Sequence, residues 1–363
     1  MKRVYFFLTA MLLIFTSAGS RDTVASLDRA MVHAVGIDIS DEGYSVTLQI
    51  FHPDGEGSDT KLDPGKSNML VVSAPAATVE RAVSLCEDKL GEFLFIGHVQ
   101  VIVLGRGVEP KDPEGLFSYF LKSRESYLGV QLASTDGTAR ELLEAELTEG
   151  AVAAQNIVSV IERSRENSDS VACDLLSVLN SESGDYAMPR LKLEGSSEDK
   201  KKEQRLLSDG AQVFTDGRRS FTLDVGECAA LAHLLGEEHR SVVELETDSD
   251  TAGFTLKSEG TEVSVLKQGD RLLCRFEVEL SVQRDQSTAV RLGGELPLSE
   301  LEKKLTSESQ ALSKRLYTEK TDLLNLTRRI KAKYPQVWLD CSESADTLLS
   351  LTYVEIKVSC VEK

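Results

Sequence analysis

Residues 274–283, CRFEVELSVQ, alternate apolar and polar side chains without interruption. The apolar set is Cys274, Phe276, Val278, Leu280 and Val282. A period of two is that of a β-strand with one buried face and one solvated face. Because half-buried strands of this kind are typical of antiparallel sheets, the stretch predicts such a sheet in the C-terminal part of the chain.

A long apolar stripe follows this strand and predicts a long helix. Its apolar residues recur at spacings of four and seven: Leu301, Leu305, Leu312, Leu316, Leu323 and Ile330. Ser299 and Glu302 have the spacing of a capping box, and Pro335 is expected to end the helix. An unbroken helix over residues 300–334 would be roughly 50 Å long. The pattern therefore allows either a break near Asn325 or one helix packed across a curved sheet.

The chain ends in a second alternating segment, in which Val354, Ile356, Val358 and Cys360 share one side. Shorter strand-like segments lie at 242–246, 254–257 and 263–267. An antiparallel sheet under a long helix is an α+β arrangement. The predicted fold class is therefore α+β: a multidomain, mixed α/β protein with a C-terminal antiparallel sheet packed against a long helix.

The first half of the chain alternates strands and helices. Strand patterns fall at 45–50, 69–73, 99–104 and 129–133, and helix patterns at 76–94, 116–121, 138–147 and 151–163. The continuous apolar run at 99–104 is typical of a strand that is covered on both faces. We expect an α/β region here.

A polar segment, EGSSEDKKKEQR at residues 194–205, separates the two halves. It has no apolar anchor, which is typical of an exposed loop or an interdomain linker. The predicted organisation is a signal peptide at 1–20, an N-terminal α/β region of one or two subdomains at 21–195, a linker at 196–206 and a C-terminal domain at 207–363.

The leader has the order of an export signal. Lys2 and Arg3 precede a mostly apolar run at residues 4–15, and small residues follow up to Ser20. A run of this length is typical of a signal peptide, because a membrane-spanning helix needs about 20 apolar residues. Cleavage before Arg21 would release an exported protein, and an uncleaved leader would leave it tethered.

The composition is strongly acidic, with 59 acidic and 41 basic residues and a net charge of −18. Affinity for nucleic acid depends on Lys and Arg contacts to phosphates. We therefore expect no nucleic-acid partner.

The six cysteines are widely spaced, with no C-x-x-C pair: Cys86, Cys173, Cys228, Cys274, Cys341 and Cys360. This spacing is neither that of a zinc ribbon nor that of a dense disulfide scaffold. Cys274 and Cys360 fall on the apolar sides of strands, where a free cysteine acts as a small hydrophobic residue. We predict no essential disulfide.

Motifs for catalysis or cofactor binding are missing from the sequence. The five histidines form no H-x-x-x-H pair: His33, His52, His98, His233 and His239. Gly105 and Gly107 follow a strand, but Pro110 stands where a dinucleotide fingerprint needs its third glycine, so both are expected to be turn residues. There is no G-x-S-x-G elbow and no P-loop. We predict no catalytic, cofactor-binding or metal-binding residue, no cofactor and no enzyme activity.

Five segments, in order, resemble the C subunit of spore nutrient germinant receptors, the Ger(x)C lipoprotein family. They are RAMVHAVGIDISDEGYSVTLQIFHP (29–53), IGHVQVIVLGRGV (96–108), LFSYFLKSRESYLGVQLASTDGTARELLEAE (116–146), DGAQVFTDGRRSFTLDVGECAALAHLLG (209–236) and TDLLNLTRRIKAKYPQVW (321–338). In the last segment Asp322, Pro335 and Trp338 match the family pattern. One departure is Ser20, which replaces the expected lipid-bearing cysteine, so that no lipid-attachment residue is present.

The resemblance implies a non-enzymatic accessory subunit that acts in spore germination. Its partners would be the membrane-embedded germinant receptor subunits A and B and the membrane surface. It would lie on the outer face of the spore inner membrane, peripheral or tethered by an uncleaved leader, and it would show an apolar docking patch. The alternative is a stand-alone exported small-ligand-binding protein, which would show one well-formed ligand pocket.

Overall fold

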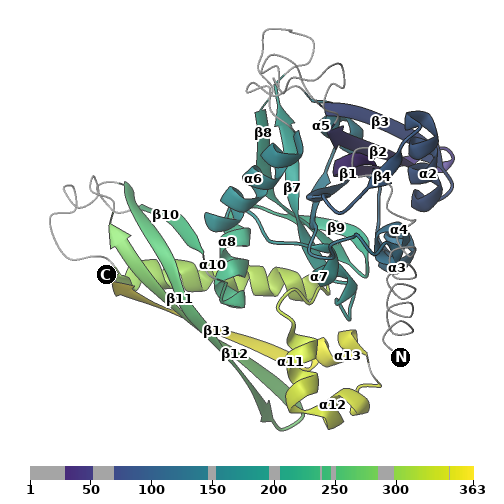
Figure 1. Cartoon of the computed structure of the whole chain (residues 1–363). Coiled ribbons are helices and arrows are strands. Elements are labelled where there is room, and N and C mark those ends of the chain that lie inside the picture. The colour runs from purple at the N-terminus through teal and green to yellow at the C-terminus, as the bar shows by residue number, and fades with distance from the viewer. Residues whose placement is uncertain are drawn as a thin grey trace, which may run out of the picture.

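The structure is a computed structural model of the chain, and it describes residues 29–51, 69–145, 153–195, 205–237, 239–246, 251–284, 298–342 and 344–363. Two β-sheets organise these residues (Figure 1). Residues 29–223 build the sheet of nine strands and are called the large-sheet region. Residues 225–363 carry the sheet of four strands and are called the small-sheet region.

The larger sheet has the strand order β3-β2-β1-β5-β6-β7-β8-β9, with β4 paired to β1. The strands are β1 (Arg29–Ser40), β2 (Gly43–Phe51), β3 (Met69–Ala76), β4 (Phe93–Phe95), β5 (Val101–Leu104), β6 (Gln131–Thr135), β7 (Tyr186–Glu194), β8 (Arg205–Thr215) and β9 (Arg218–Leu223). The central strands β1, β5, β6 and β7 pair in parallel. Antiparallel pairs flank them on both sides.

Helices cover both faces of this sheet. One face packs against α2 (Val79–Leu90), α3 (Pro113–Leu116), α4 (Ser118–Lys122) and α7 (Leu175–Leu179), and the other against α5 (Ala139–Glu144) and α6 (Ala153–Glu166). All four residues of β5 are buried. Ile102 and Leu104 join one core, and Val101 and Val103 join the other. The prediction of a strand covered on both faces is confirmed.

Asp38 fixes the position of α5 on the sheet. Its carboxylate accepts hydrogen bonds from the backbone N–H groups of Ala139 (2.7 Å) and Arg140 (3.0 Å), the first residues of the helix. Gly105 follows β5 beneath this carboxylate, and a Cβ atom at Gly105 would lie 1.8 Å from Asp38 Oδ1. The turn after β5 therefore needs glycine at position 105 for steric reasons.

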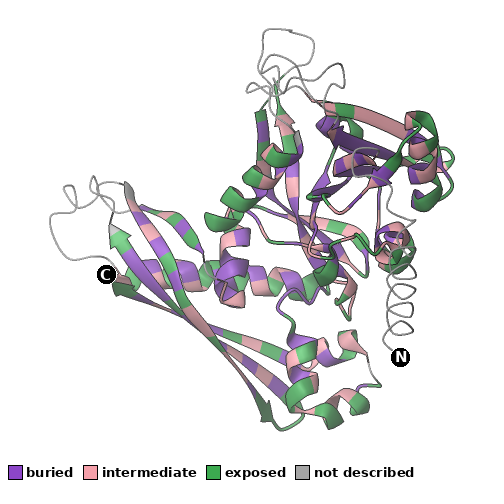
Figure 2. Ribbon diagram, in the orientation of Figure 1, coloured by how far each residue is buried: buried purple, intermediate pink, exposed green. Residues whose placement is uncertain are grey.

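The smaller sheet contains β10 (Arg240–Glu246), β11 (Thr251–Gln268), β12 (Arg271–Arg284) and β13 (Thr352–Glu362), in that order. The alternation predicted at 274–283 is confirmed, since the five apolar side chains are buried and Glu277 and Glu279 are exposed. Figure 2 shows buried and exposed residues alternating along the long strands. The segments at 254–257 and 263–267 prove to be parts of β11, whose pairing with β12 shifts between Ser258 and Gly260.

One feature of the predicted C-terminal sheet needs correction. β10, β11 and β12 are antiparallel neighbours as expected, but β13 pairs with β12 in parallel. Between these two strands the chain passes through helices, and such a crossover returns it in the same direction. Side-chain alternation is the same in both kinds of pairing, so it could not reveal the orientation.

The predicted long helix is divided. It consists of α10 (Leu298–Thr318) and α11 (Leu326–Lys333), followed by α12 (Pro335–Asp340) and α13 (Ala345–Ser350). The break lies before α11, where Asn325 has a left-handed φ of 54°. Ser299 is already inside α10, so the predicted capping box is wrong, and Glu302 instead accepts a 2.8 Å hydrogen bond from the backbone N–H of Cys360. Pro335 is the first residue of α12, where a missing N–H costs nothing.

The predicted linker at 196–206 lies between two neighbouring strands. Residues 196–204 are outside the described part of the chain, and Arg205 and Leu206 belong to β8. β8 pairs antiparallel with β7. The larger sheet therefore continues across the predicted domain boundary, because polar residues can connect two strands of one sheet as readily as two domains.

Candidate functional site: the junction of the two regions

Asp185, next to the start of β7, connects the two regions. Its Oδ1 accepts a hydrogen bond from the N–H of Asp216 in the β8–β9 turn (3.0 Å), and its Oδ2 accepts one from the N–H of Asp322 (2.9 Å). Asp322 lies between α10 and α11 in the small-sheet region. Burial raises the pKa of the Asp185 carboxyl group. One half-buried carboxylate thus joins segments far apart in the sequence.

Asp322 in turn organises the start of α11. Its carboxylate accepts hydrogen bonds from the N–H groups of Leu326 (2.7 Å) and Thr327 (2.8 Å), which are unpaired donors at a helix start. Its neighbour Thr321 bonds through its hydroxyl to the hydroxyl of Thr215 in β8, with 2.7 Å between the oxygens. Burial raises the pKa of the Asp322 carboxyl group, and the nearby Asp185 charge adds to the effect.

A second connection lies at the other end of the junction. The helix α8 (Val225–Leu235) begins with a capping box formed by Asp224 and Glu227. Arg315 of α10 bonds to the Glu227 carboxylate and donates a 3.1 Å hydrogen bond to the carbonyl of Thr222. Its guanidinium also lies 4.7 Å from the ring centre of Phe221. Arg315 therefore holds α10 against both α8 and the last strand of the larger sheet.

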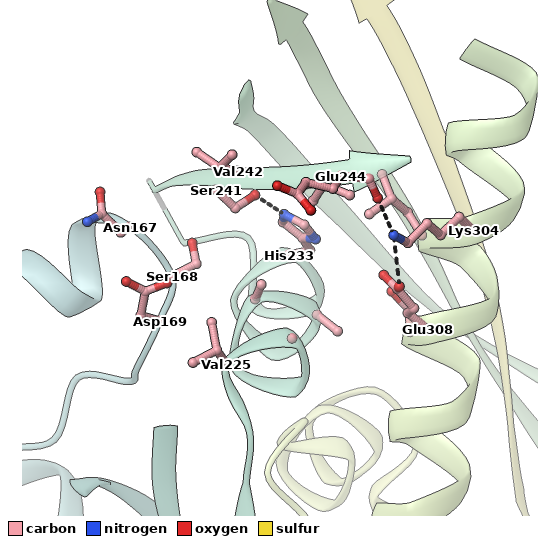
Figure 3. A pocket seen from close by; sticks show the side chains of 16 residues that line it. Asn167, Ser168, Asp169, Val225, His233, Ser241, Val242, Glu244, Lys304 and Glu308 are labelled. Atoms are coloured by element: carbon pink, nitrogen blue, oxygen red, sulfur yellow. Dashed lines mark hydrogen bonds and ion pairs between the residues drawn. The ribbon is translucent and has the colours of Figure 1, made fainter. Parts of the chain in front are cut away.

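A cavity of about 380 Å³ lies beside α8 and α10 (Figure 3). Residues from four segments line it: Asn167, Ser168 and Asp169 after α6; Val225, Gly226, Ala229, Ala230 and His233 of α8; Ser241, Val242, Val243 and Glu244 of β10; Lys304, Leu305, Glu308 and Ser309 of α10. The cavity is thus shared by both regions. Smaller cavities of about 260 Å³ and 170 Å³ lie near Asp322.

The cavity lining is acidic. Burial raises the pKa of the carboxyl groups of Asp169 and Glu308. Lys304 opposes them, but its Nζ lies 3.8 Å from Glu308 Oε1 and donates a hydrogen bond to the carbonyl of Glu244. The carboxylate of Glu308 is therefore only partly neutralised.

His233 lines the cavity and is 1% exposed. Burial, with a smaller contribution from His239, lowers the pKa of His233 to about 3. The two rings lie 4.8 Å apart, and His233 Nε2 lies 3.3 Å from Ser241 Oγ. A buried imidazole with so low a pKa is a weak base, so this pair resembles a packed structural contact more than an activated nucleophile.

The structure also places the other residues considered in the sequence. His33 packs near Phe51 and His98, with ring centres 6.0 Å and 6.4 Å away, and His52 lies outside the described residues. Trp338 packs partly buried against the core, under Lys331. Ser20 is outside the described part of the chain. Among the described residues, no group of three or more His, Cys, Asp or Glu side chains could hold a metal ion.

The six cysteines are buried and free, and burial raises the pKa of each thiol. In Cys86 and Cys274 the pKa rises to about 11. Thiols in this state are poor nucleophiles, because the thiolate is the reactive form. The absence of an essential disulfide stays a prediction.

Sequence reasoning identified only part of the junction. Asp322 belongs to a segment that carries the family resemblance, whereas no local pattern marks Asp169, Asp185 or Arg315. Their partners lie far away in the chain, and in an acidic sequence a single aspartate carries no local signal. The capping-box spacing of Asp224 and Glu227 is the one local pattern that could have marked the start of α8.

A group of exposed apolar side chains lies elsewhere in the large-sheet region. Phe93 is 67% exposed and Tyr127 is 69% exposed, and Leu128 and Leu176 are also exposed. Phe93 of β4 lies opposite Arg29 of β1 in the sheet. The Arg29 guanidinium bonds to the carboxylate of Glu125, which lies two residues before Tyr127. The N–H of Leu176 donates to the carbonyl of Leu128 (3.0 Å). We call Phe93, Tyr127, Leu128 and Leu176 the apolar patch.

The sequence matches two family models of spore germination proteins, and the fold matches a solved structure. The family model described as "Spore germination protein N-terminal domain" matches residues 22–193, and the one described as "Spore germination B3/ GerAC like, C-terminal" matches residues 209–360. A solved structure titled "Crystal Structure of the GerBC protein" has a similar fold, with a TM-score of 0.51 and 17% identity over 90% of this chain and 96% of that chain. No curated protein matches the sequence at a significant level. The resemblance read from the sequence is confirmed, and the chain belongs to the GerAC family of spore germination proteins.

Proposed function

We propose that the protein is a non-enzymatic accessory subunit of a nutrient germinant receptor at the spore inner membrane. The observation that carries this proposal is the match of both domain models, in order, over residues 22–193 and 209–360. The chain thus retains both parts of the family architecture. Its role would be to hold membrane-embedded receptor subunits, A and B, through protein–protein contacts.

The junction supports a role as a rigid scaffold. Asp185 and Asp322 connect the regions at one side of α8, and Arg315 connects them at another. The hydrogen bonds at these positions are charge-assisted, which makes them stronger than bonds between neutral groups. A subunit of this kind would transmit a movement of one partner to the other without bending at the junction.

The apolar patch supports a docking role. Groups of exposed apolar side chains often mark a contact with a partner or a membrane. The patch includes Phe93, which pairs with Arg29, the first described residue after the leader. A chain tethered through its leader would carry the patch close to the membrane. We therefore assign the patch to contact with the membrane-embedded subunits.

Anchoring would depend on the leader and on protein contacts. No helix in the described part of the chain is long and apolar enough to cross a membrane. Ser20 has a hydroxyl group, which cannot form the thioether that carries the lipid of a lipoprotein. Growth of sporulating cells with labelled palmitate should leave this chain unlabelled while known lipoproteins of the same cells are labelled. A labelled chain would contradict this part of the proposal.

Co-purification from spores tests the main proposal. Inner membranes are solubilised with a mild detergent, and the proteins bound to an affinity-tagged version of the chain are identified by mass spectrometry. The proposal predicts two proteins with several membrane spans in stoichiometric amounts. Recovery of the chain alone in the soluble fraction would instead favour the stand-alone small-ligand-binding protein.

A further inference from the structure

We propose that the cavity shown in Figure 3 binds a small organic cation that carries primary ammonium groups. This inference does not depend on the receptor role, since it concerns the isolated chain. It rests on the volume, the charge and the hydrogen-bonding groups of the cavity.

The space is sufficient for a small molecule. A cavity of about 380 Å³ falls in the range of ligand sites, which runs from roughly 300 to 1,000 Å³. Apolar side chains such as Val225 and Leu305 line it together with polar ones. Such a mixture suits a short aliphatic molecule with charged ends.

The charge of the lining favours a cation. The lining contains three carboxylates, those of Asp169, Glu244 and Glu308, and one ammonium group, that of Lys304. Figure 3 shows Asp169 and Glu308 on opposite sides of the end of α8. Burial raises the pKa of both carboxyl groups, while Lys304 lowers that of Glu308, so the surrounding side chains stabilise the ionised carboxylates only in part. His233 adds no positive charge at neutral pH, because its pKa is about 3.

Ser309 is the second observation that indicates a ligand. It lines the cavity and is 1% exposed, and its Oγ has no hydrogen-bond partner among the described residues. A buried hydroxyl without a partner costs free energy, and in native proteins such groups usually bind water or a ligand. An ammonium group in the cavity would donate to this oxygen, and the carboxylate of Glu308 on the same helix would attract it.

Lys304 limits this binding and also makes it testable. Its Nζ lies 3.8 Å from Glu308 Oε1, so a ligand ammonium group must compete with it for the same carboxylate. Removal of the Lys304 charge should therefore strengthen ligand binding. A variant that was merely less well folded would not bind more tightly.

The test uses 1,4-diaminobutane, titrated into the purified full-length chain by isothermal calorimetry in about 0.15 M salt, where attraction by exposed charges is largely screened. We expect saturable binding at one site and none of the isosteric neutral 1,4-butanediol. Glu308→Gln should weaken binding about tenfold, as the loss of one charge-assisted hydrogen bond implies. Ser309→Ala should weaken it about threefold, and Lys304→Met should tighten it.

Glu279→Gln is the matched control, because Glu279 is an exposed glutamate of β12 and lies outside the cavity lining. The affinity of the Glu279→Gln variant for 1,4-diaminobutane should equal that of the wild-type chain. Absence of saturable binding, equal weakening by Glu279→Gln and Glu308→Gln, or no tightening in Lys304→Met would each overturn the inference. In those cases the diamine would be attracted only by the overall negative charge of the protein.

Discussion

The backbone N–H of Asp322 donates a 2.9 Å hydrogen bond to Oδ2 of Asp185, a residue 137 positions earlier in the chain. The same Asp185 carboxylate accepts from Asp216, and the Asp322 carboxylate accepts from the first residues of α11. A chain of bonds therefore runs from the β8–β9 turn of the large-sheet region into the helices of the small-sheet region. Loss of Asp185 should loosen the contact between the two regions.

Asp185→Ala should lower the free energy of unfolding by about 2 kcal/mol, because the N–H groups of Asp216 and Asp322 lose a charged acceptor. Urea denaturation monitored by circular dichroism measures this change. The matched control is Asp346→Ala, since Asp346 is exposed and bonds only weakly to Lys320 at 3.4 Å. This control should change stability by less than about 1 kcal/mol. Equal effects of the two substitutions would show that Asp185 does not hold the junction.

Gly105→Ala should destabilise the protein by about 2–3 kcal/mol, because the added methyl group would collide with the Asp38 carboxylate that caps α5. The comparison variant is Gly226→Ala in α8, where the nearest atom would lie 3.4 Å away, at Asp224 Oδ1. Alanine has a higher helix propensity than glycine, so the Gly226→Ala protein should be as stable as the wild type or slightly more stable. Thermal unfolding of both proteins measures the difference, and a Gly105→Ala protein as stable as wild type would refute the steric argument.

Arg315→Leu should cost about 2 kcal/mol, since the side chain bonds to Glu227 and to the Thr222 carbonyl and stacks on Phe221. Arg275 provides the contrast. It forms a 2.9 Å ion pair with Glu355 on the solvated face of the smaller sheet, with both side chains partly exposed. Arg275→Leu should cost less than about 1 kcal/mol. Chemical denaturation of the two variants decides whether Arg315 is a structural connection or an ordinary surface charge.

His233 should make the protein less stable as the pH falls below 6.5. Its pKa is about 3 in the folded state and 6.5 in the unfolded state, so the unfolded chain binds more protons between these values. The stabilising contribution is complete above pH 6.5 and declines toward pH 3. Between pH 6.5 and 5 the loss amounts to roughly 2 kcal/mol.

The measurement compares urea unfolding at pH 7 and pH 5 for the wild type and for His233→Gln. The variant should lose about 2 kcal/mol less than the wild type between the two pH values. Burial also raises the pKa of the carboxyl groups of Asp38, Asp185 and Asp322, which act in the opposite sense, but these residues are present in both proteins. His98→Gln, a change at an exposed histidine, should keep the wild-type difference. A His233→Gln protein with an unchanged pH dependence would contradict the account of this residue.

Local patterns in the sequence predicted much of the fold. The alternation at 274–283 identified β12 and its buried face, and the apolar run at 99–104 identified β5 as a strand covered on both sides. Both predictions depend on side-chain periodicity, which burial enforces residue by residue. The resemblance to the germinant receptor family could also be recognised from the sequence, because five segments occur in the family order along the chain.

Features that depend on distant partners could not be predicted. The parallel pairing of β13 follows from the path of the chain through α10–α13, and alternation alone does not encode it. The continuation of the larger sheet into β8 and β9 likewise had no local signal, since a polar segment precedes β8. The carboxylates of Asp169 and Asp185 are ordinary in an acidic sequence, and only the fold brings them to the junction.

The most direct test of the receptor role combines the co-purification with a change in the apolar patch. The variant Phe93→Asp/Tyr127→Asp places charges on two exposed side chains, and Val361→Asp, at an exposed residue of β13, is the control. We predict that the patch variant stays folded but no longer co-purifies with multi-span membrane proteins from spore membranes, whereas the control does. Undiminished co-purification of the patch variant would contradict the assigned docking surface, and failure of the wild-type chain to co-purify with any multi-span protein would contradict the receptor role itself.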